Sequence, residues 1–225
     1  MIRSVLLVAS ASMMLAVPTL AATVFTDDFS GDAPALNASL TNFNVAGQVD
    51  VVSAINGYGI TTLGGNVVDL DGSSGPGEII SKLSYGFNAG DTITLGMLIG
   101  GAQRGQSADS LYTGVNFEDA IDIFDWTGFG YLNTFEGDVL SIGGLGLGVT
   151  SFASDNPFAW SGMSFRAGNA GILTFYIGTE SADNVGPLLA GVSLDITPAP
   201  VPLPATGAVL LLGIGLLAGL RRKRG

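Results

Sequence analysis

The stretch Thr92-Ile-Thr-Leu95 alternates polar and apolar side chains, and Val192-Ser-Leu-Asp-Ile196 does so again about a hundred residues later. A strand with one buried face shows this period of two, because successive side chains point to opposite sides of a sheet. Together with similar runs between Gly-, Asn- and Pro-containing turns, the predicted strands are Gln48–Ser53, Asn66–Leu70, Glu78–Ser84, Thr92–Ile99, Leu111–Phe117, Met163–Ala167, Gly171–Gly178 and Gly191–Ile196. Residues 23–197 are therefore expected to form an all-β domain, a jelly-roll-like antiparallel β-sandwich.

The least regular part of this domain is Ser107–Pro157, which is rich in Gly, Phe and Asp. Within it, Ile142–Gly148 fits either a weak strand or a loop. The whole chain of 225 residues contains 34 glycines, about twice the usual share. That composition is typical of a sandwich with many tight turns and not of a helical bundle.

Charge is distributed very unevenly along the chain. All nineteen acidic residues lie between Asp27 and Asp195, and this interval holds only three basic residues, Lys82, Arg104 and Arg166. The domain alone would therefore carry a net charge of −16. Such a domain repels phosphate backbones, so nucleic acid is excluded as a partner.

The chain has no histidine and no cysteine. Ser-His-Asp hydrolysis, thiolate catalysis, disulfides and the usual His- or Cys-based metal sites have no residues to use. A glycosidase would need a pair of facing carboxylates, and no glutamate of this chain stands in a recognisable motif. The domain is therefore expected not to be an enzyme.

The N-terminus has the three parts of a secretory signal. Arg3 is followed by an apolar run over residues 5–17, and small residues come next. We expect residues 1–22 to be a signal peptide that forms a helix and is cut near Ala21 or Ala22. The expected partners are the Sec translocon and signal peptidase.

The C-terminus has the form of a membrane-inserted tail. Alternating prolines make residues 198–204 an extended stalk that cannot enter a helix. Residues 205–220 carry no charge and predict a transmembrane helix of ~24 Å, slightly shorter than the bilayer core. The tail 221–225 follows, and its cytoplasmic stop is the cluster Arg221, Arg222, Lys223 and Arg224.

The segment before this helix resembles a known sorting signal. Its residues are Val201, Pro202, Leu203, Pro204 and Ala205. With the helix and the basic tail, they are similar to the VPLPA variant of PEP-CTERM signals, which implies cleavage by an exosortase, a membrane protease of Gram-negative bacteria that make exopolysaccharide. Leu203–Gly207 also fits the LPxTG motif of sortase substrates, but no Lys-, Ser- or Thr-rich wall-spanning linker precedes it. A permanent anchor is the remaining alternative.

The middle of the chain resembles the galactose-binding-like sandwiches of "choice-of-anchor" domains. The matching blocks are Val49–Val52, Asn66–Gly72, Ala89–Leu95 and Asp183–Leu189, in the family's order. This chain departs from the family at Ala190 and Gly191, where acidic or amide residues are usual. The resemblance therefore implies the fold, and leaves a ligand role for this pair in doubt.

Three groups of residues are candidates for chemistry. Asp69, Asp71 and Glu78 surround a glycine turn and offer oxygen ligands for a structural calcium ion, but their spacing fits a calcium loop only in part, and a solvated Asp-Gly turn is the favoured explanation. Arg104 stands in a glycine-rich turn and either faces a ligand or forms an ordinary salt bridge. The aromatic candidates for stacking on sugars, which alternatively fill the core, are Tyr58, Tyr85, Tyr112, Trp126, Tyr131 and Trp160.

Taken together, the sequence predicts an exported cell-surface or extracellular-matrix protein that is not catalytic. Its precursor would be held briefly in the inner membrane and then delivered to the cell surface or outside, in association with exopolysaccharide or a biofilm. The alternatives are a carbohydrate-binding module with a specific glycan and, third, a glycoside hydrolase or lyase.

Overall fold

A computed structural model describes residues 20–55, 58–104, 108–117, 130–131, 145–181 and 183–200. One compact domain spans Ala21–Pro198. Most of the predicted signal peptide, the sorting motif and the tail that follows it lie outside the described residues. In the part of the chain that is described, no helix is long and apolar enough to cross a membrane.

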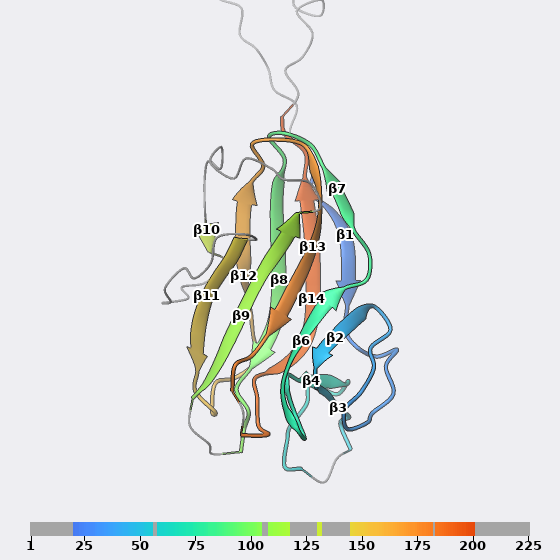
Figure 1. Cartoon of the computed structure of the whole chain (residues 1–225), viewed down its shortest axis with the longest axis vertical. Helices are drawn as coiled ribbons and strands as arrows, with labels where there is room; N and C mark the ends of the chain where they lie inside the picture. Colours follow the sequence, from blue (N-terminus) through green and yellow to red (C-terminus); the bar gives the residue numbers. More distant parts are fainter. Residues whose placement is uncertain are drawn as a thin grey trace, which may run out of the picture. The chain divides into compact units, whose positions relative to one another are not determined.

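One of the two sheets is built around the last strand of the chain (Figure 1). Strand β14 pairs with β8 along one side and with β4 and β1 along the other, and every pairing is antiparallel. The order across this seven-stranded sheet is β10-β12-β8-β14-β4-β3, with β1 beside β14. Its strands are β1 Ala22–Asp27, β3 Asp50–Val52, β4 Val67–Asp69, β8 Thr92–Gly100, β10 Gly130–Tyr131, β12 Ala159–Arg166 and β14 Leu188–Thr197.

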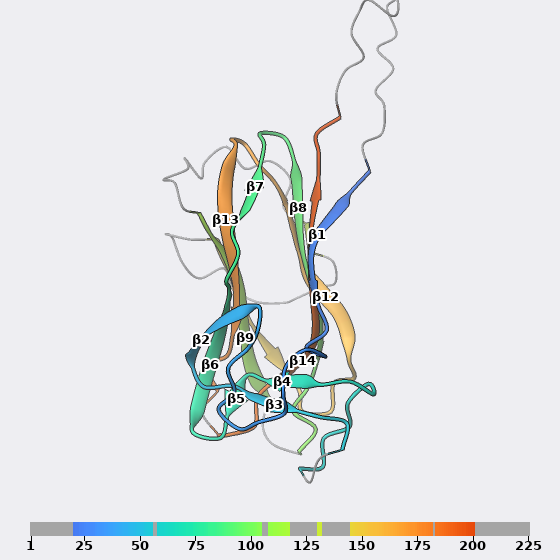
Figure 2. The same cartoon turned by 90° about the vertical axis from the view of Figure 1, so that its right-hand side faces the viewer.

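The second sheet also has seven strands and is likewise antiparallel. Its order is β11-β9-β13-β6-β2, with β5 paired to β6 and β7 paired to β13. The strands are β2 Phe43–Gly47, β5 Asp71–Gly72, β6 Gly75–Ser81, β7 Tyr85–Phe87, β9 Asp109–Phe117, β11 Leu145–Phe152 and β13 Gly171–Gly178. Figure 2 shows the two sheets facing each other, which confirms the predicted all-β sandwich.

The core lies between the two sheets. In β8, Ile93, Leu95 and Met97 are fully buried, while the threonines that alternate with them are partly exposed. In β13 of the opposite sheet, Leu173 and Phe175 are also fully buried. The period of two in the sequence thus corresponds to one packed face and one outer face on each sheet.

The pairings of β14 show which strand ends lie at each end of the sandwich. Its first residue, Leu188, pairs with Asp69 of β4, and its last, Thr197, pairs with Thr92 at the start of β8. Ala22, the first residue of β1, pairs with Ile196. The domain's first and last strands therefore meet the rest of the chain at the same end of the sandwich, and the end of β4 lies at the other (Figure 2).

Candidate functional site

A pocket of about 220 Å³ opens at the end of the sandwich where β4 and β8 finish. Its lining comes from six separate stretches of the chain, which only the fold brings together. The lining residues are Leu36, Asp50, Val52, Tyr58, Ser73, Arg104 and Asn184.

Arg104 stands in the loop that follows β8, and main-chain contacts fix this loop. The Gln103 N–H donates to the carbonyl of Ser154 at 2.8 Å. The Gln103 side chain accepts from the N–H of Thr61 at 2.9 Å and donates to its carbonyl at 3.0 Å. The Gln103 side chain therefore ties the loop after β8 to the 58–65 segment. This contact holds the neighbouring Arg104 next to that segment.

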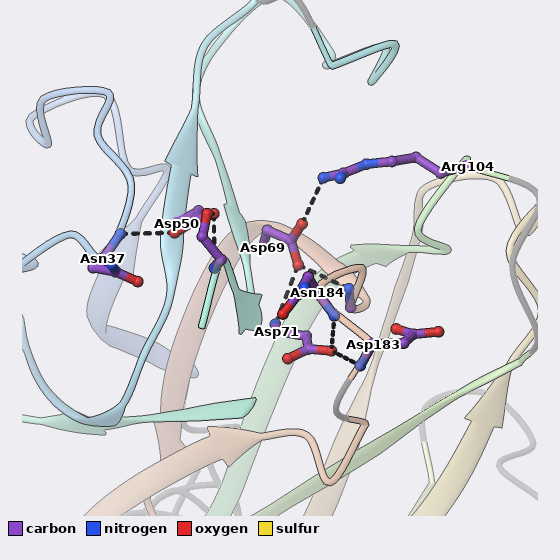
Figure 3. A network of polar contacts seen from close by, with 9 residues as sticks. Asn37, Asp50, Asp69, Asp71, Arg104, Asp183 and Asn184 are labelled. Carbon is purple, nitrogen blue, oxygen red and sulfur yellow. Dashed lines mark hydrogen bonds and ion pairs between the residues drawn. The ribbon is translucent and has the colours of Figure 1, made fainter. Parts of the chain in front are cut away.

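Asp69, the last residue of β4, orients the arginine (Figure 3). Its side chain is 1% exposed, and Oδ2 accepts from Nη2 of Arg104 at 3.0 Å. Its Oδ1 accepts the N–H groups of Gly186 at 2.9 Å and Asp71 at 3.1 Å. Burial raises the pKa of Asp69 to about 7, against the opposite effect of these N–H donors and of the Arg104 charge.

Tyr58 lies beside the same arginine. The guanidinium carbon of Arg104 is 5.9 Å from the centroid of the Tyr58 ring, within the range of a cation–π contact. Tyr58 is half-exposed, and the side chain of Arg104 is 26% exposed. A charged planar group and an aromatic ring therefore both face the solvent at the pocket mouth.

Asp50, the first residue of β3, forms the opposite wall of the pocket. Its Oδ1 accepts the N–H of Asn37 at 2.7 Å, and its Oδ2 accepts from the N–H and the hydroxyl of Ser73 at 3.1 and 2.6 Å. Both oxygens of this buried carboxylate are therefore used to join two loops. Sequence reasoning placed Ser73 beside the Asp69–Gly72 turn but did not identify Asp50 as a site residue, because Asp50 stands in no motif that carries chemistry.

Asp71 positions Asn184, the remaining residue of the pocket lining (Figure 3). This carboxylate is fully buried, and its Oδ2 accepts the N–H groups of Asp183 at 2.8 Å and Asn184 at 2.9 Å. Asn184 has a positive φ of 66°, which asparagine tolerates better than most residues. A Cβ at Gly186 would come within 2.4 Å of the Asp71 nitrogen, so a glycine is needed for this loop to approach β5.

The arrangement does not fit the calcium site that the sequence suggested. The structure brings Asp69 and Asp71 together, but three of their four oxygens already accept N–H donors, and only Oδ1 of Asp71 is buried without a partner. Glu78 points to the outer face of the second sheet, toward Tyr112, whose pKa burial and this carboxylate both raise. In the described part of the chain, no three acidic side chains are close enough to share a metal ion.

The aromatic candidates separate into different environments. Tyr58 lines the pocket, Tyr85 is buried in the core, and Trp160 is 52% exposed on the outer face of the first sheet. Tyr112 lies over Gly178, where a Cβ would meet its ring at 2.5 Å. Trp126 and the side chain of Tyr131 lie outside the described part of the chain.

The predicted processing sites lie at or beyond the limits of the described chain. Ala21 directly precedes β1, and Ala22 is its first residue, so cleavage here stays a prediction. The sorting motif 201–205 and the basic stop 221–224 lie outside the described residues.

Comparison with known proteins gives little beyond this geometry. No family model matches the chain, and no curated protein matches it. A solved structure, the K1 cleaved adhesin domain of Lys-gingipain from Porphyromonas gingivalis W83, is similar with a TM-score of 0.41 and 10% identity. The match covers 77% of this chain and 97% of that domain. A likeness this weak says nothing about ligand or activity.

Proposed function

We propose that this chain is an exported surface or extracellular-matrix protein whose sandwich binds a glycan at the Arg104 pocket without chemical turnover. The observation that carries the proposal is the Arg104–Asp69 ion pair beside the half-exposed Tyr58 ring. Sugars are bound by this combination, since an aromatic face packs on the C–H groups and a fixed planar donor hydrogen-bonds the hydroxyls.

Binding is favoured over hydrolysis by the state of the two carboxylates at the pocket. Asp50 uses both oxygens to hold Asn37 and Ser73, and Asp69 uses both to hold main-chain N–H groups and Arg104. A glycosidase needs two carboxylates that face the substrate, one as acid and one as base or nucleophile. These two hold the pocket walls in place instead.

Charge indicates the class of glycan. The positive charge of Arg104 faces the Asp69 carboxylate, and the domain as a whole carries a net charge of −16. An acidic polysaccharide would be repelled during approach, whereas an uncharged one would not. We therefore propose a neutral sugar unit as the ligand.

The predicted processing is consistent with display of this pocket. The chain leaves the sandwich after Thr197, at one end of β14, and the pocket lies near Leu188, at the other end of this strand. A strand of ten residues separates these two points by ~30 Å. If the VPLPA-type tail (201–225) holds the precursor in the inner membrane until an exosortase or a sortase cuts it, the pocket is on the side away from the point of attachment. The exopolysaccharide layer is then a natural source of the ligand.

A glycan array with the domain 23–197 tests the proposal, because this part of the chain makes up nearly all of the compact unit Ala21–Pro198. Arg104→Ala should lower affinity for the recognised neutral glycan at least tenfold. Arg166→Ala is the matched control, since it removes the same charge from a site where Arg166 donates only to the Gly90 carbonyl at 3.1 Å among the contacts described. Equal affinity of both variants and the wild type would refute the pocket, and silence on the whole array would refute glycan binding.

A further inference from the structure

Trp160 is a half-exposed tryptophan on the outer face of the first sheet. It lies in β12 of the first sheet, opposite Leu98 of β8, and is 52% exposed. Its neighbours at alternate positions of β12, Gly162 and Ser164, share the outer face with it. A half-exposed indole on a sheet face offers a flat apolar surface that a ligand can cover.

The indole lies flat along the sheet and does not stand out from it. A Cβ at Gly96 would lie 3.5 Å from Cε3 and Cζ3 of the ring, and a Cβ at Gly191 would lie 3.8 Å from Cη2. Gly96 is in β8 and Gly191 in β14, so the ring extends from its own strand across the next one. One ring face thus rests on two glycine positions, and about half of the side chain is exposed.

Hydroxyl groups lie to one side of this ring. Ser193 Oγ lies 2.8 Å from the Cβ position of Gly96, next to the indole. One row further along, the hydroxyls of Thr94 and Ser164 hydrogen-bond each other at 3.0 Å across β8 and β12. Each can also contact a ligand, because a hydroxyl has one donor and two acceptor positions.

The residues around the ring carry no charge, although the domain is strongly acidic. Two residues of opposite charge stand at the edge of this surface on the same face: Asp195, which pairs with Thr94, and Arg166, two residues after Ser164. Residues 94–98, 160–164 and 191–193 contain no Asp, Glu, Lys or Arg. A patch that is neutral, flat and partly hydroxylated matches an uncharged ligand that is itself flat and rich in hydroxyls. Trp160 and Leu98 offer too little apolar area for a second copy of the chain, since a stable interface needs about 800 Å² on each partner.

We propose that Trp160 and the hydroxyls of Thr94, Ser164 and Ser193 form a binding surface for an uncharged polysaccharide chain on the outer face of the first sheet. This surface is separate from the Arg104 pocket and does not depend on it. A pyranose ring would stack its C–H face on the indole, and its hydroxyl edges would reach the serine and threonine side chains.

Tryptophan fluorescence tests the proposal directly, because the chain has only two tryptophans, Trp126 and Trp160. The probes are neutral hexaoses of β-1,4-glucan, β-1,3-glucan, xylan and mannan, with polygalacturonate as the acidic comparison. In Trp126→Phe, Trp160 is the sole reporter, and at least one neutral hexaose should shift or quench its emission. In Trp160→Phe the same sugar should leave the emission of Trp126 unchanged.

Affinity electrophoresis in gels that contain the corresponding polymer gives the second measurement. Trp160→Ala should reduce retardation at least tenfold, and Trp160→Phe, which keeps an aromatic face, should reduce it less. Arg104→Ala should keep the Trp160 signal, so failure of the pocket and failure of this surface can be told apart. Melting curves establish that the variants are folded, which is expected because Trp160 is half-exposed.

Two results would overturn the proposal. One is the absence of any change in Trp160 emission with every neutral sugar, or a response to polygalacturonate alone. The other is a dimer in light scattering that Trp160→Ala dissociates, because the indole would then be covered by a second copy of the chain.

Discussion

Replacement of Asp69 by alanine is the most informative test of how the pocket is held together. The carboxylate is 1% exposed and accepts from Gly186, Asp71 and Arg104. Asp69→Ala leaves two buried N–H groups without an acceptor, at about 1–3 kcal/mol each. It also leaves Arg104 without its carboxylate, which costs less because that side chain is 26% exposed. The sum is a loss of about 2–7 kcal/mol in the free energy of unfolding.

Two further variants separate the contributions to this loss. Asp69→Asn keeps an oxygen for the two N–H groups and loses the ion pair, so we expect about half the effect. Arg104→Ala should cost about 1 kcal/mol, because the carboxylate that remains can take up a proton: burial already raises its pKa to about 7. The expected order of destabilisation is therefore Asp69→Ala, then Asp69→Asn, then Arg104→Ala.

Urea unfolding of the domain 23–197 at pH 7, followed by circular dichroism, measures these differences. A total stability of 5–15 kcal/mol is usual for a domain, so Asp69→Ala could be partly unfolded, and the two milder variants then carry the comparison. A loss below 1 kcal/mol for Asp69→Ala would refute the role of the buried carboxylate. Equal losses for Asp69→Asn and Asp69→Ala would show that the ion pair, and not the N–H groups, dominates.

Four other outcomes are expected. Burial raises the pKa of Asp69 to about 7 and of Asp109 to about 6, so the folded domain binds more protons than the unfolded chain from pH 4 to 7. Its unfolding free energy should therefore fall as the pH rises, by about 2–3 kcal/mol per pH unit near pH 5 and about 1 kcal/mol per unit near pH 6.5, and a rise measured by urea titration would contradict this. Gly186→Ala should lower the melting temperature by several degrees, since its Cβ would meet the Asp71 nitrogen at 2.4 Å, whereas Gly86→Ala, with nothing within 4 Å, should not. A chelator should leave the melting temperature unchanged, because the carboxylates at Asp69 and Asp71 are already occupied, and a clear drop would restore the calcium site. Mass spectrometry of the secreted protein should find a start at Ala22 or Thr23 and no residues 221–225; an intact tail would argue for a permanent anchor.

Strands with one buried face were predictable from the sequence. Thr92–Ile99 and Gly171–Gly178 match β8 and β13 to within a residue, because each alternates cleanly over a packed core. Strands β1, β2 and β7 were missed. The burial of β1 alternates only weakly, since it lies at one side of β14, and β7 has only three residues, with a glycine at the centre. Ile142–Gly148 was ambiguous, and Leu145–Phe152 is strand β11.

The site was less predictable, because its parts meet only through the fold. The pair Asp69 and Asp71 was visible as a short motif, and in extended chain residues two apart share a side, as they do here. Nothing in the sequence links Asp69 to Arg104, thirty-five residues away, or Asp50 to Ser73. The turn at Asn184–Pro187 was recognised, but its role against Asp71 depends on sheet order.

If the chain is exported as we propose, the position of β14 has a consequence for its passage. This strand is the last of the domain to leave a channel that threads the chain from its N-terminus, and it pairs with β8, β4 and β1. The partner residues Ala22 and Ile196 are separated by nearly the whole domain, so the first sheet cannot close until the final strand has emerged. The domain would therefore stay open throughout its passage and complete itself only outside, when the stalk appears. If the chain is exported as proposed, this late-closing strand would keep the precursor competent for transport until the whole domain has passed.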